Sequence, residues 1–282
     1  ARFDESANIR YAKEMQSQGI KLIFGSPNLK VHSKICLIER LENGNLKKYG
    51  FISTGNFNES TAKIYTDLTL FTSNDKILDE VSNVFNFFNA NYKKYVFKNL
   101  FVSPINTETK IKKLINNEII NAKNGKESWI KIKINNITSY SLIRSLYDAS
   151  RAGVKIQMIV RGICCLIPGH KNMSENIEVI SIVDRFLEHT RFMIFSNNDN
   201  NKVFISSADW MTRNLDNRVE VTCPILQEDL KKEILDIFNI YWSDSIKARL
   251  INSNSKSRIT NQKSFKSQEK MYNYYLNKIE GL

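Results

Sequence analysis

Two short stretches, Val31-His32-Ser33-Lys34 and Glu188-His189-Thr190-Arg191, hold two of the three histidines of the chain and decide how its fold is interpreted. Each places an imidazole two residues before a cation. In a strand, side chains at positions i and i+2 point to the same face, so each stretch predicts a histidine beside a lysine or an arginine. A ring nitrogen can attack phosphorus, and the cation can hold the oxygens on which charge collects. The pattern therefore indicates chemistry on a phosphoryl group.

The two stretches lie 157 residues apart (189 minus 32), a spacing that suits two stacked domains. Other segments repeat as well. Residues 18–23 parallel 152–157, residues 53–58 parallel 206–211, and a helical pattern at 75–88 parallels one at 228–242. We expect a first domain at 1–99 and a second at 100–282. The strand expected at 129–134 has no counterpart in the first domain, so we expect the natural protein to extend upstream of Ala1.

Hydrophobic periodicity predicts alternating helices and strands in both units. In the first unit we expect helices at 5–18 and 75–88 and strands at 20–24, 31–39, 49–53 and 64–71. In the second unit we expect helices at 107–122, 139–152 and 228–242, with strands at 129–134, 154–160, 178–181, 186–195, 202–206 and 218–221. A mobile tail at 251–266 and a last docking helix at 267–279 complete the expected order. The expected class is α/β, with mixed sheets flanked by helices.

Composition limits the partners and the compartment. The net charge of +12 favours a polyanionic partner, although a chain so rich in Lys, Asn and Ile could owe the charge to compositional drift, and we give both explanations even weight. No run of eighteen apolar residues predicts a membrane span. No signal peptide is visible, and the four cysteines lack CxxC spacing, so we expect reduced thiols and a cytoplasmic location.

His32 and Lys34, followed by Thr54-Gly55-Asn56, resemble the His-x-Lys motif of the phospholipase D superfamily, in which two such motifs face each other across a pseudo-twofold axis. That resemblance implies two tandem phospholipase D-like domains with the active site between them. The chain departs from the pattern at Glu39, where an aspartate is usual, and at Arg191 and Ala208-Asp209 in the second motif. An arginine presents a bidentate fork to phosphate, which suits holding a chain of phosphates more than opening a simple diester.

A closer resemblance covers nearly the whole chain and fades after about Ala248. The chain is similar to the C-terminal half of the type 1 polyphosphate kinase family. The motifs that carry the resemblance run in order along the sequence: Arg2-Phe3-Asp4-Glu5, Val31-His32-Ser33-Lys34, Thr54-Gly55-Asn56-Phe57-Asn58, Tyr65-Thr66-Asp67, Val160-Arg161-Gly162-Ile163-Cys164, Ser181-Ile182-Val183-Asp184-Arg185-Phe186-Leu187-Glu188-His189 and Ser206-Ser207-Ala208-Asp209-Trp210-Met211-Thr212-Arg213-Asn214.

The family resemblance implies a reversible transfer of the γ-phosphate of ATP to inorganic polyphosphate. It implies that His32 carries the phosphoryl group as a phosphoramidate and that His189 is a second active-site histidine near the nucleotide. Tyr65 and Arg161 match ATP-contacting positions. Arg2 matches an arginine of the magnesium–phosphate site, and because an arginine cannot ligate a cation we assign it to the phosphate oxygens. Further side chains are expected to bind phosphate: Lys34, Asn56, Lys63, Arg185, Arg191 and Arg213.

The implied cofactor is Mg²⁺, with ATP as the phosphoryl donor and ADP as the product. The implied partners are inorganic polyphosphate and further copies of the chain, with no nucleic acid; peripheral membrane association stays open. Two other functions remain as alternatives. One is a phosphodiesterase or nuclease of the phospholipase D kind, which would use the same histidines without a nucleotide donor. The other is a polyanion-binding segment that is inactive without upstream ATP-binding elements.

Overall fold

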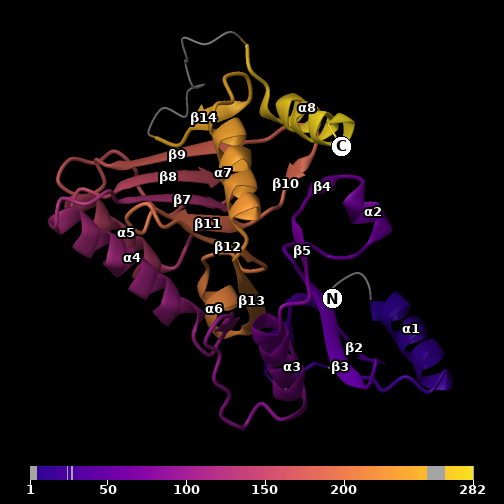
Figure 1. The fold of residues 1–282 in the computed structure, drawn as a ribbon. Coiled ribbons are helices and arrows are strands. Elements are labelled where there is room, and N and C mark those ends of the chain that lie inside the picture. Colours follow the sequence, from indigo (N-terminus) through magenta and orange to yellow (C-terminus); the bar gives the residue numbers. More distant parts are fainter. Residues whose placement is uncertain (1–4, 24, 27, 253–263, 282) are drawn as a thin grey trace.

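The fold is organised around one large mixed sheet in the second half of the chain (Figure 1). The structure, a computed structural model, describes residues 5–23, 25–26, 28–252 and 264–281. The strand order is β1-β13-β12-β11-β7-β8-β9-β14, with β6 also paired to β13. Its strands are β1 (Lys30–Val31), β6 (Phe101–Ser103), β7 (Trp129–Ile134), β8 (Lys155–Val160), β9 (Ile177–Ile182), β11 (Phe192–Phe195), β12 (Lys202–Ser206), β13 (Arg218–Ile225) and β14 (Ala248–Leu250).

Helices cover both faces of this sheet because its strands are apolar on both sides. Within β11, Met193 and Phe195 belong to the core formed with α4 (Thr107–Lys123) and α5 (Tyr140–Arg151). Phe192 and Ile194 alternate with them and pack in the core beneath α7 (Glu228–Trp242). The last helix, α8 (Ser267–Glu280), lies beside α7 near the strand β10 (Leu187–Glu188) (Figure 1). The short helix α6 (Thr212–Asp216) precedes β13.

The first half of the chain builds a smaller antiparallel sheet of β2 (Lys34–Glu42), β3 (Asn45–Ser53) and β5 (Thr69–Thr72). Helix α3 (Asp75–Asn89) packs against it through Ile77, Val81 and Val84. The Asn74 side chain accepts a hydrogen bond from the backbone N–H of Ile77 (3.3 Å) and so caps the start of this helix. This half also contains α1 (Glu5–Ser17), α2 (Glu59–Ala62) and β4 (Tyr65–Thr66).

Two short parallel pairings connect the halves. β1 of the first half pairs with β13 in the large sheet, and β4 of the first half pairs with β10 of the second. One hydrophobic core also runs through both halves, since Ile52 and Ile77 belong to the same cluster as Ile205 and Ile234. The division at residues 99 and 100 therefore stays a prediction, drawn through a molecule with a continuous core.

The α/β class with mixed sheets and flanking helices is confirmed, and most expected elements match to within a few residues. Four expected strands are wrong in part. Among the described residues of 20–24 there is no strand. The strand expected at 31–39 is interrupted at His32-Ser33, because the N–H groups of both residues bond to the carbonyl of Val219. The strands expected at 64–71 and 186–195 are each divided in two, and β6, β14, α2 and α6 were not predicted.

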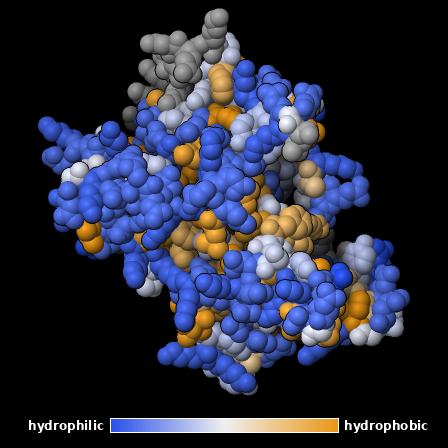
Figure 2. All heavy atoms as spheres, in the orientation of Figure 1, coloured by the Kyte–Doolittle hydropathy of each residue, from blue (hydrophilic) through white to orange (hydrophobic). Residues whose placement is uncertain are grey.

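The face shown in Figure 2 is largely hydrophilic, with hydrophobic atoms exposed in scattered groups. Across the part of the chain that the structure describes, no helix is long and apolar enough to cross a membrane. The expected mobile tail at 251–266 falls largely outside the described residues, whereas the expected docking helix forms as α8.

Candidate active site

The two histidines lie at equivalent points where a strand of one half pairs with a strand of the other. Val31 is in register with Val219, so His32 directly follows β1 beside Glu220 of β13. Glu188 is in register with Thr66, so His189 directly follows β10 beside Asp67. Each histidine therefore meets a carboxylate that the opposite half of the chain supplies.

His32 is held by a buried carboxylate. Its Nδ1 lies 2.8 Å from Oε2 of Glu220, whose side chain is fully buried. Ser207 donates to the same oxygen (2.5 Å), and the Asn214 amide donates to Oε1 (2.6 Å). With Glu220 as acceptor, Nδ1 carries the proton and Nε2 keeps its lone pair. No hydrogen bond from a described residue reaches Nε2, so this atom is available to a substrate.

His189 is held at both ring nitrogens. Its Nδ1 lies 2.9 Å from both carboxylate oxygens of Asp67, which also accepts a hydrogen bond from Thr54 (2.6 Å). Its Nε2 lies 3.0 Å from Nη1 of Arg191. Because a guanidinium can only donate, Nε2 must accept this bond and Nδ1 must carry the proton. The two histidines share a tautomer but differ in the availability of Nε2.

A repeat of hydrogen bonds supports the two carboxylates. Thr54 and Asp67 are 13 residues apart (67 minus 54), as are Ser207 and Glu220 (220 minus 207). The Thr54 hydroxyl accepts from the N–H of the residue after Asp67 (3.0 Å), and the Ser207 hydroxyl does so from the residue after Glu220 (3.1 Å). The two halves thus build the same turn around different side chains.

The repeat also explains why the second motif has an alanine where the first has a glycine. A Cβ added to Gly55 would lie 1.9 Å from a carboxylate oxygen of Asp67, so only glycine fits there. At the equivalent position Ala208 is accommodated and buried. The departure from Gly-x-Asn therefore leaves the turn intact.

Two cations act on both rings, which places the histidines around one centre. Burial lowers the pKa of His32 below its usual 6.5, and the charges of Lys34 and Arg191 lower it further, although Glu220 opposes them. Burial likewise lowers the pKa of His189, where Asp67 opposes the same two cations. Burial also lowers the pKa of Lys34 to about 8. Both imidazoles are therefore neutral at pH 7 beside positive charge.

Hydrogen bonds to neighbouring residues hold the two arginines of the site, Arg191 and Arg161, in place. Arg191 is buried, and its guanidinium donates to Asp209 (3.3 Å) and to the Thr54 carbonyl (3.3 Å). Arg161 donates through Nε to the Asn135 side chain (2.6 Å) and to the carbonyl just before His189 (2.8 Å). These bonds of Arg161 connect the carboxyl ends of β7 and β8 to the backbone next to His189.

A cavity of about 500 Å³ opens next to Asp67, the carboxylate that binds His189. Tyr65, Asn56 and Asp67 line it together with the start of α2. The Tyr65 ring lies 5.0 Å from the His189 ring, centroid to centroid. This cavity has room for a ligand, with an aromatic face and amide groups around it.

The structure gathers only part of the predicted set. It groups His32, Lys34, Tyr65, Arg161, His189 and Arg191 around one centre, with Asn56 in the adjoining cavity. In the described part of the chain, no hydrogen bond or ion pair connects Lys63 or Arg213 with either histidine; Lys63 is exposed and paired with Glu59 (2.9 Å). Arg185 is exposed against Phe186, and Arg2 lies outside the described residues.

The carboxylates that orient the histidines had no role in the sequence-based prediction. Asp67 was noted only within a motif, and Glu220 was missed. The acidic residue expected after Lys34, Glu39, instead lies on β2 near Lys48 (3.7 Å), away from the imidazoles. The signal that could have found both residues was the shared 13-residue spacing from Thr54 and Ser207.

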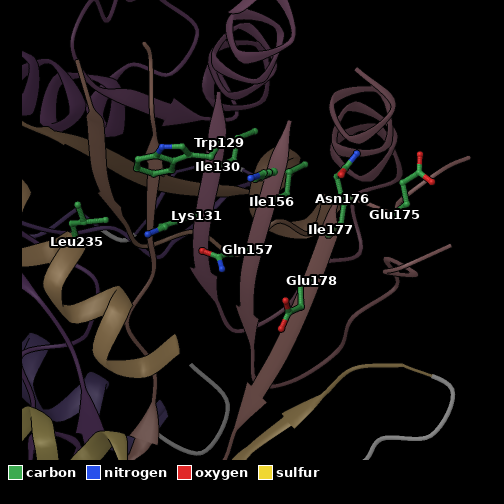
Figure 3. A pocket seen from close by; sticks show the side chains of 11 residues that line it. Trp129, Ile130, Lys131, Ile156, Gln157, Glu175, Asn176, Ile177, Glu178 and Leu235 are labelled. Carbon is green, nitrogen blue, oxygen red and sulfur yellow. The ribbon is translucent and has the colours of Figure 1, made fainter. Parts of the chain in front are cut away.

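Another cavity, of about 470 Å³, lies at the amino ends of β7, β8 and β9 (Figure 3). Trp129, Lys131, Gln157 and Glu178 point toward it, and Leu235 borders it from α7. It contains no histidine and lies at the opposite end of the strands that lead to Asn135 and Arg161. The paired histidines therefore define the candidate site.

The described residues do not form a metal cage. They contain no group of three or more His, Cys, Asp or Glu side chains placed to hold an ion. The carboxylates nearest the histidines, Asp67 and Glu220, already accept hydrogen bonds from imidazoles and hydroxyls. A resident Mg²⁺ does not fit these two carboxylates, because the ion is usually held by one or two free carboxylates together with waters and substrate phosphates.

The structure is a mixed α/β fold in which two histidine–carboxylate pairs lie where the two halves of the chain meet. The chain belongs to the polyphosphate kinase family: the family models described as "Polyphosphate kinase C-terminal domain 1" and "Polyphosphate kinase C-terminal domain 2" match residues 1–94 and 100–271.

Relatives with the same description align along almost the whole chain. The polyphosphate kinase of Vibrio parahaemolyticus is 50% identical over 280 residues, covering 98% of this chain and 40% of the relative. That of Escherichia coli K12 is 46% identical over 277 residues, covering 97% and 40%. The crystal structure of the Porphyromonas gingivalis polyphosphate kinase superposes with a TM-score of 0.92 at 41% identity, covering all of this chain and 44% of that one. The chain thus spans about 40% of the length of the curated relatives.

Proposed function

We propose that this chain carries the phosphoryl-transfer centre of a polyphosphate kinase, which moves the γ-phosphate of ATP to inorganic polyphosphate by way of phospho-His32. Two observations support the proposal: the chain belongs to that family, and the charges of Lys34 and Arg191 act on both histidines. The chain is shorter than the relatives, so the proposal concerns the natural full-length protein.

The observation that carries the proposal is that no described residue bonds to Nε2 of His32, whereas Arg191 bonds to Nε2 of His189. In the first step Nε2 of His32 attacks the γ-phosphorus, a P–N bond forms, and the bond to the β,γ-bridging oxygen breaks to release ADP. Positive charge develops on the ring, and the buried carboxylate of Glu220 stabilises it through Nδ1–H. In the second step a terminal oxygen of polyphosphate attacks the same phosphorus, the P–N bond breaks, and the imidazole is restored.

The remaining residues bind and neutralise the phosphates. Lys34 donates a hydrogen bond from Nζ to the His32 carbonyl and supplies charge to the transferred group. His189 is assigned as the second histidine, near the nucleotide, and it can act as an acid or base when the leaving oxygen replaces Arg191 at its Nε2. Tyr65 and Arg161 are assigned to ATP, with the base stacked against the Tyr65 ring. The other phosphate-binding assignments are unchanged: Asn56, Lys63, Arg185, Arg191, Arg213 and, outside the described residues, Arg2.

Magnesium enters this proposal as part of the substrate. Mg²⁺ commonly binds through the phosphates of ATP and keeps several waters, so it needs few protein ligands. That behaviour agrees with a site whose carboxylates are all engaged by hydrogen-bond donors.

Labelled ATP tests the proposal. The full-length protein is incubated with γ-labelled ATP and Mg²⁺ and quenched in alkali, and acid-labile label on the protein is measured. We expect labelling that the His32→Ala variant loses and the His170→Ala variant keeps, since His170 is exposed in a loop. Label that persists in His32→Ala, or no label in the parent, would overturn the assignment. Turnover of bis-nitrophenyl phosphate without nucleotide would instead favour the phosphodiesterase.

The cellular context is also a proposal. We expect the full-length protein to form a homo-oligomer in the cytoplasm, with peripheral membrane association left open, as its family implies. Light scattering on the purified protein measures the oligomeric state, and cell fractionation measures the location.

A further inference from the structure

The C-terminal helix α8 reaches the strand that carries His189. Gln268, in the first turn of α8, is buried, and its carboxamide contacts β10 and the residue before it. Its Nε2 donates to the carbonyl of Phe186 (2.9 Å), and its Oε1 accepts from the N–H of Phe186 (3.0 Å). Gln268 thus bonds to this backbone as a neighbouring strand would, and among the described strands β10 pairs with β4 alone.

The same carboxamide also binds the residue next to His189. Nε2 of Gln268 donates to Oε1 of Glu188 (2.7 Å). Oε2 of Glu188 lies 3.1 Å from Nζ of Lys133 and accepts from the Thr66 hydroxyl (3.2 Å). Glu188 and Lys133 are both almost fully buried, so their charges depend on these partners. The network extends to His189, because the Thr66 hydroxyl accepts from the His189 N–H (3.3 Å). It extends to Asp67 because Thr66 directly precedes that residue.

Helix α8 is itself firmly anchored. The N–H of Ser267 donates to Asp244 (2.8 Å), a buried residue whose other oxygen accepts from the N–H groups of Ile246, Lys247 and Ala248 at the start of β14. Tyr275 and Lys278 bond to Glu233 of α7 (3.0 and 2.6 Å), and Met271 packs on the shared core. The position of Gln268 is therefore set by the large sheet and α7, independently of the first half of the chain.

We propose that Gln268 is a positioning residue that fixes Glu188 and thereby holds the imidazole of His189 against Asp67. The catalytic consequence rests on the proposed function; the structural consequence does not. Without Gln268, the buried Glu188 carboxylate would lose one donor and keep those of Tyr241 and Thr66, and the backbone at Phe186 would lose both of its bonds to α8. The His189 ring would then sample a wider range of positions.

Nitrogen NMR of the histidine rings tests the structural part, because the chain has only three histidines. We compare the parent with Gln268→Met, which keeps the length of the side chain but cannot hydrogen bond, and with Gln268→Glu, which cannot donate to Glu188. We expect the His189 ring signals to shift or broaden in both variants, while those of His32 and His170 stay in place. Tyr275→Phe is the matched control: it removes a bond that anchors α8 but leaves β10 untouched, so its His189 signals should match the parent.

The catalytic part is measured as ATP:polyphosphate transfer by the full-length variants. We expect kcat to fall about 10²-fold in Gln268→Met, since small displacements of a reacting group cost that much, with less change in the KM for polyphosphate. Unchanged His189 signals in folded Gln268 variants, or shifts equally large in Tyr275→Phe, would overturn the positioning role. A parent without transfer activity whose His189 signals still respond to Gln268 would refute the kinase and leave the positioning role standing.

Discussion

At the scale of single residues, the site rests on an asymmetry between two nearly equivalent imidazoles. Both rings present Nδ1 to a carboxylate, yet Arg191 occupies Nε2 of His189, while no described residue occupies Nε2 of His32. A nucleophilic imidazole needs a free lone pair on one ring nitrogen. It also needs an acceptor at the N–H of the other nitrogen, which stabilises the positive charge that the ring gains. Only His32 meets both conditions, which is why we assign the phosphoryl group to it.

Replacing Glu220 tests whether this carboxylate fixes the tautomer of His32 and stabilises the positive charge on its ring. Both oxygens of Glu220 accept hydrogen bonds, so a Glu220→Gln amide would have to point its NH₂ group at a donor. The imidazole would lose its fixed tautomer and the negative charge beside it. We expect the rate of His32 phosphorylation to fall about 10²-fold or more, measured by rapid quench with labelled ATP. Glu228→Gln, at an exposed carboxylate paired with Lys231, is the control and should label at the parental rate.

The pKa values predict a bell-shaped dependence of kcat/KM on pH. Below the lowered pKa of His32, Nε2 is protonated and cannot attack, so activity rises as pH rises through that value, which lies under 6.5. Lys34 has a pKa of about 8 and loses its charge above it, so activity falls as pH rises through about 8. Arginine stays charged, so Lys34→Arg should move the alkaline limb upward. An alkaline limb that stays near 8 in this variant would exclude Lys34 as its origin; Lys232→Arg, at an exposed pair with Asp236, is the control.

At the scale of elements, the order of helices and strands could be predicted, but the strand interruptions at the site could not. Periodicity located β7, β12 and α7 at their observed bounds, because each buries a regular apolar pattern. The segments around His32 and His189 look like continuous strands in the sequence. In the structure both are interrupted at the histidine, since the backbone there bonds to the opposite half of the chain. Such long-range pairing leaves no local signal, and the shared 13-residue spacing from Thr54 and Ser207 was the one trace of Asp67 and Glu220 in the sequence.

The turn at Gly55 yields a prediction about the same elements. A Gly55→Ala side chain would overlap Asp67, which must then move away from His189. We expect a loss of about 1–3 kcal/mol in the free energy of unfolding, as for overpacked sites, together with a lower transfer rate. The reverse change at the equivalent position, Ala208→Gly, should cost only about 0.5–1 kcal/mol through backbone entropy. Urea unfolding measures both variants, and equal losses would show that the close approach of Asp67 does not matter.

At the scale of the whole molecule, the site exists because two short strands of the first half, β1 and β4, pair with strands of the second half. Each carboxylate belongs to the half that does not hold its histidine, and a single core continues beneath both β5 and β12. Internal repetition in the sequence predicted two units and a site between them. It did not indicate that β1 would join the sheet of the other unit, because two residues carry too little pattern to specify a partner.

This continuity predicts that the two halves unfold together. All three tryptophans lie in the second half, at positions 129, 210 and 242, so their fluorescence reports on that half alone. Hydrogen exchange in β2 and β3, followed by mass spectrometry, reports on the first half. Because Ile52 and Ile77 share a core with Ile205 and Ile234, separating the halves would expose apolar surface on both, and we expect both probes to give the same urea midpoint. A midpoint for β2 and β3 well below that of the tryptophans would mean that the first half opens independently, and that the two imidazoles share a centre only while this contact holds.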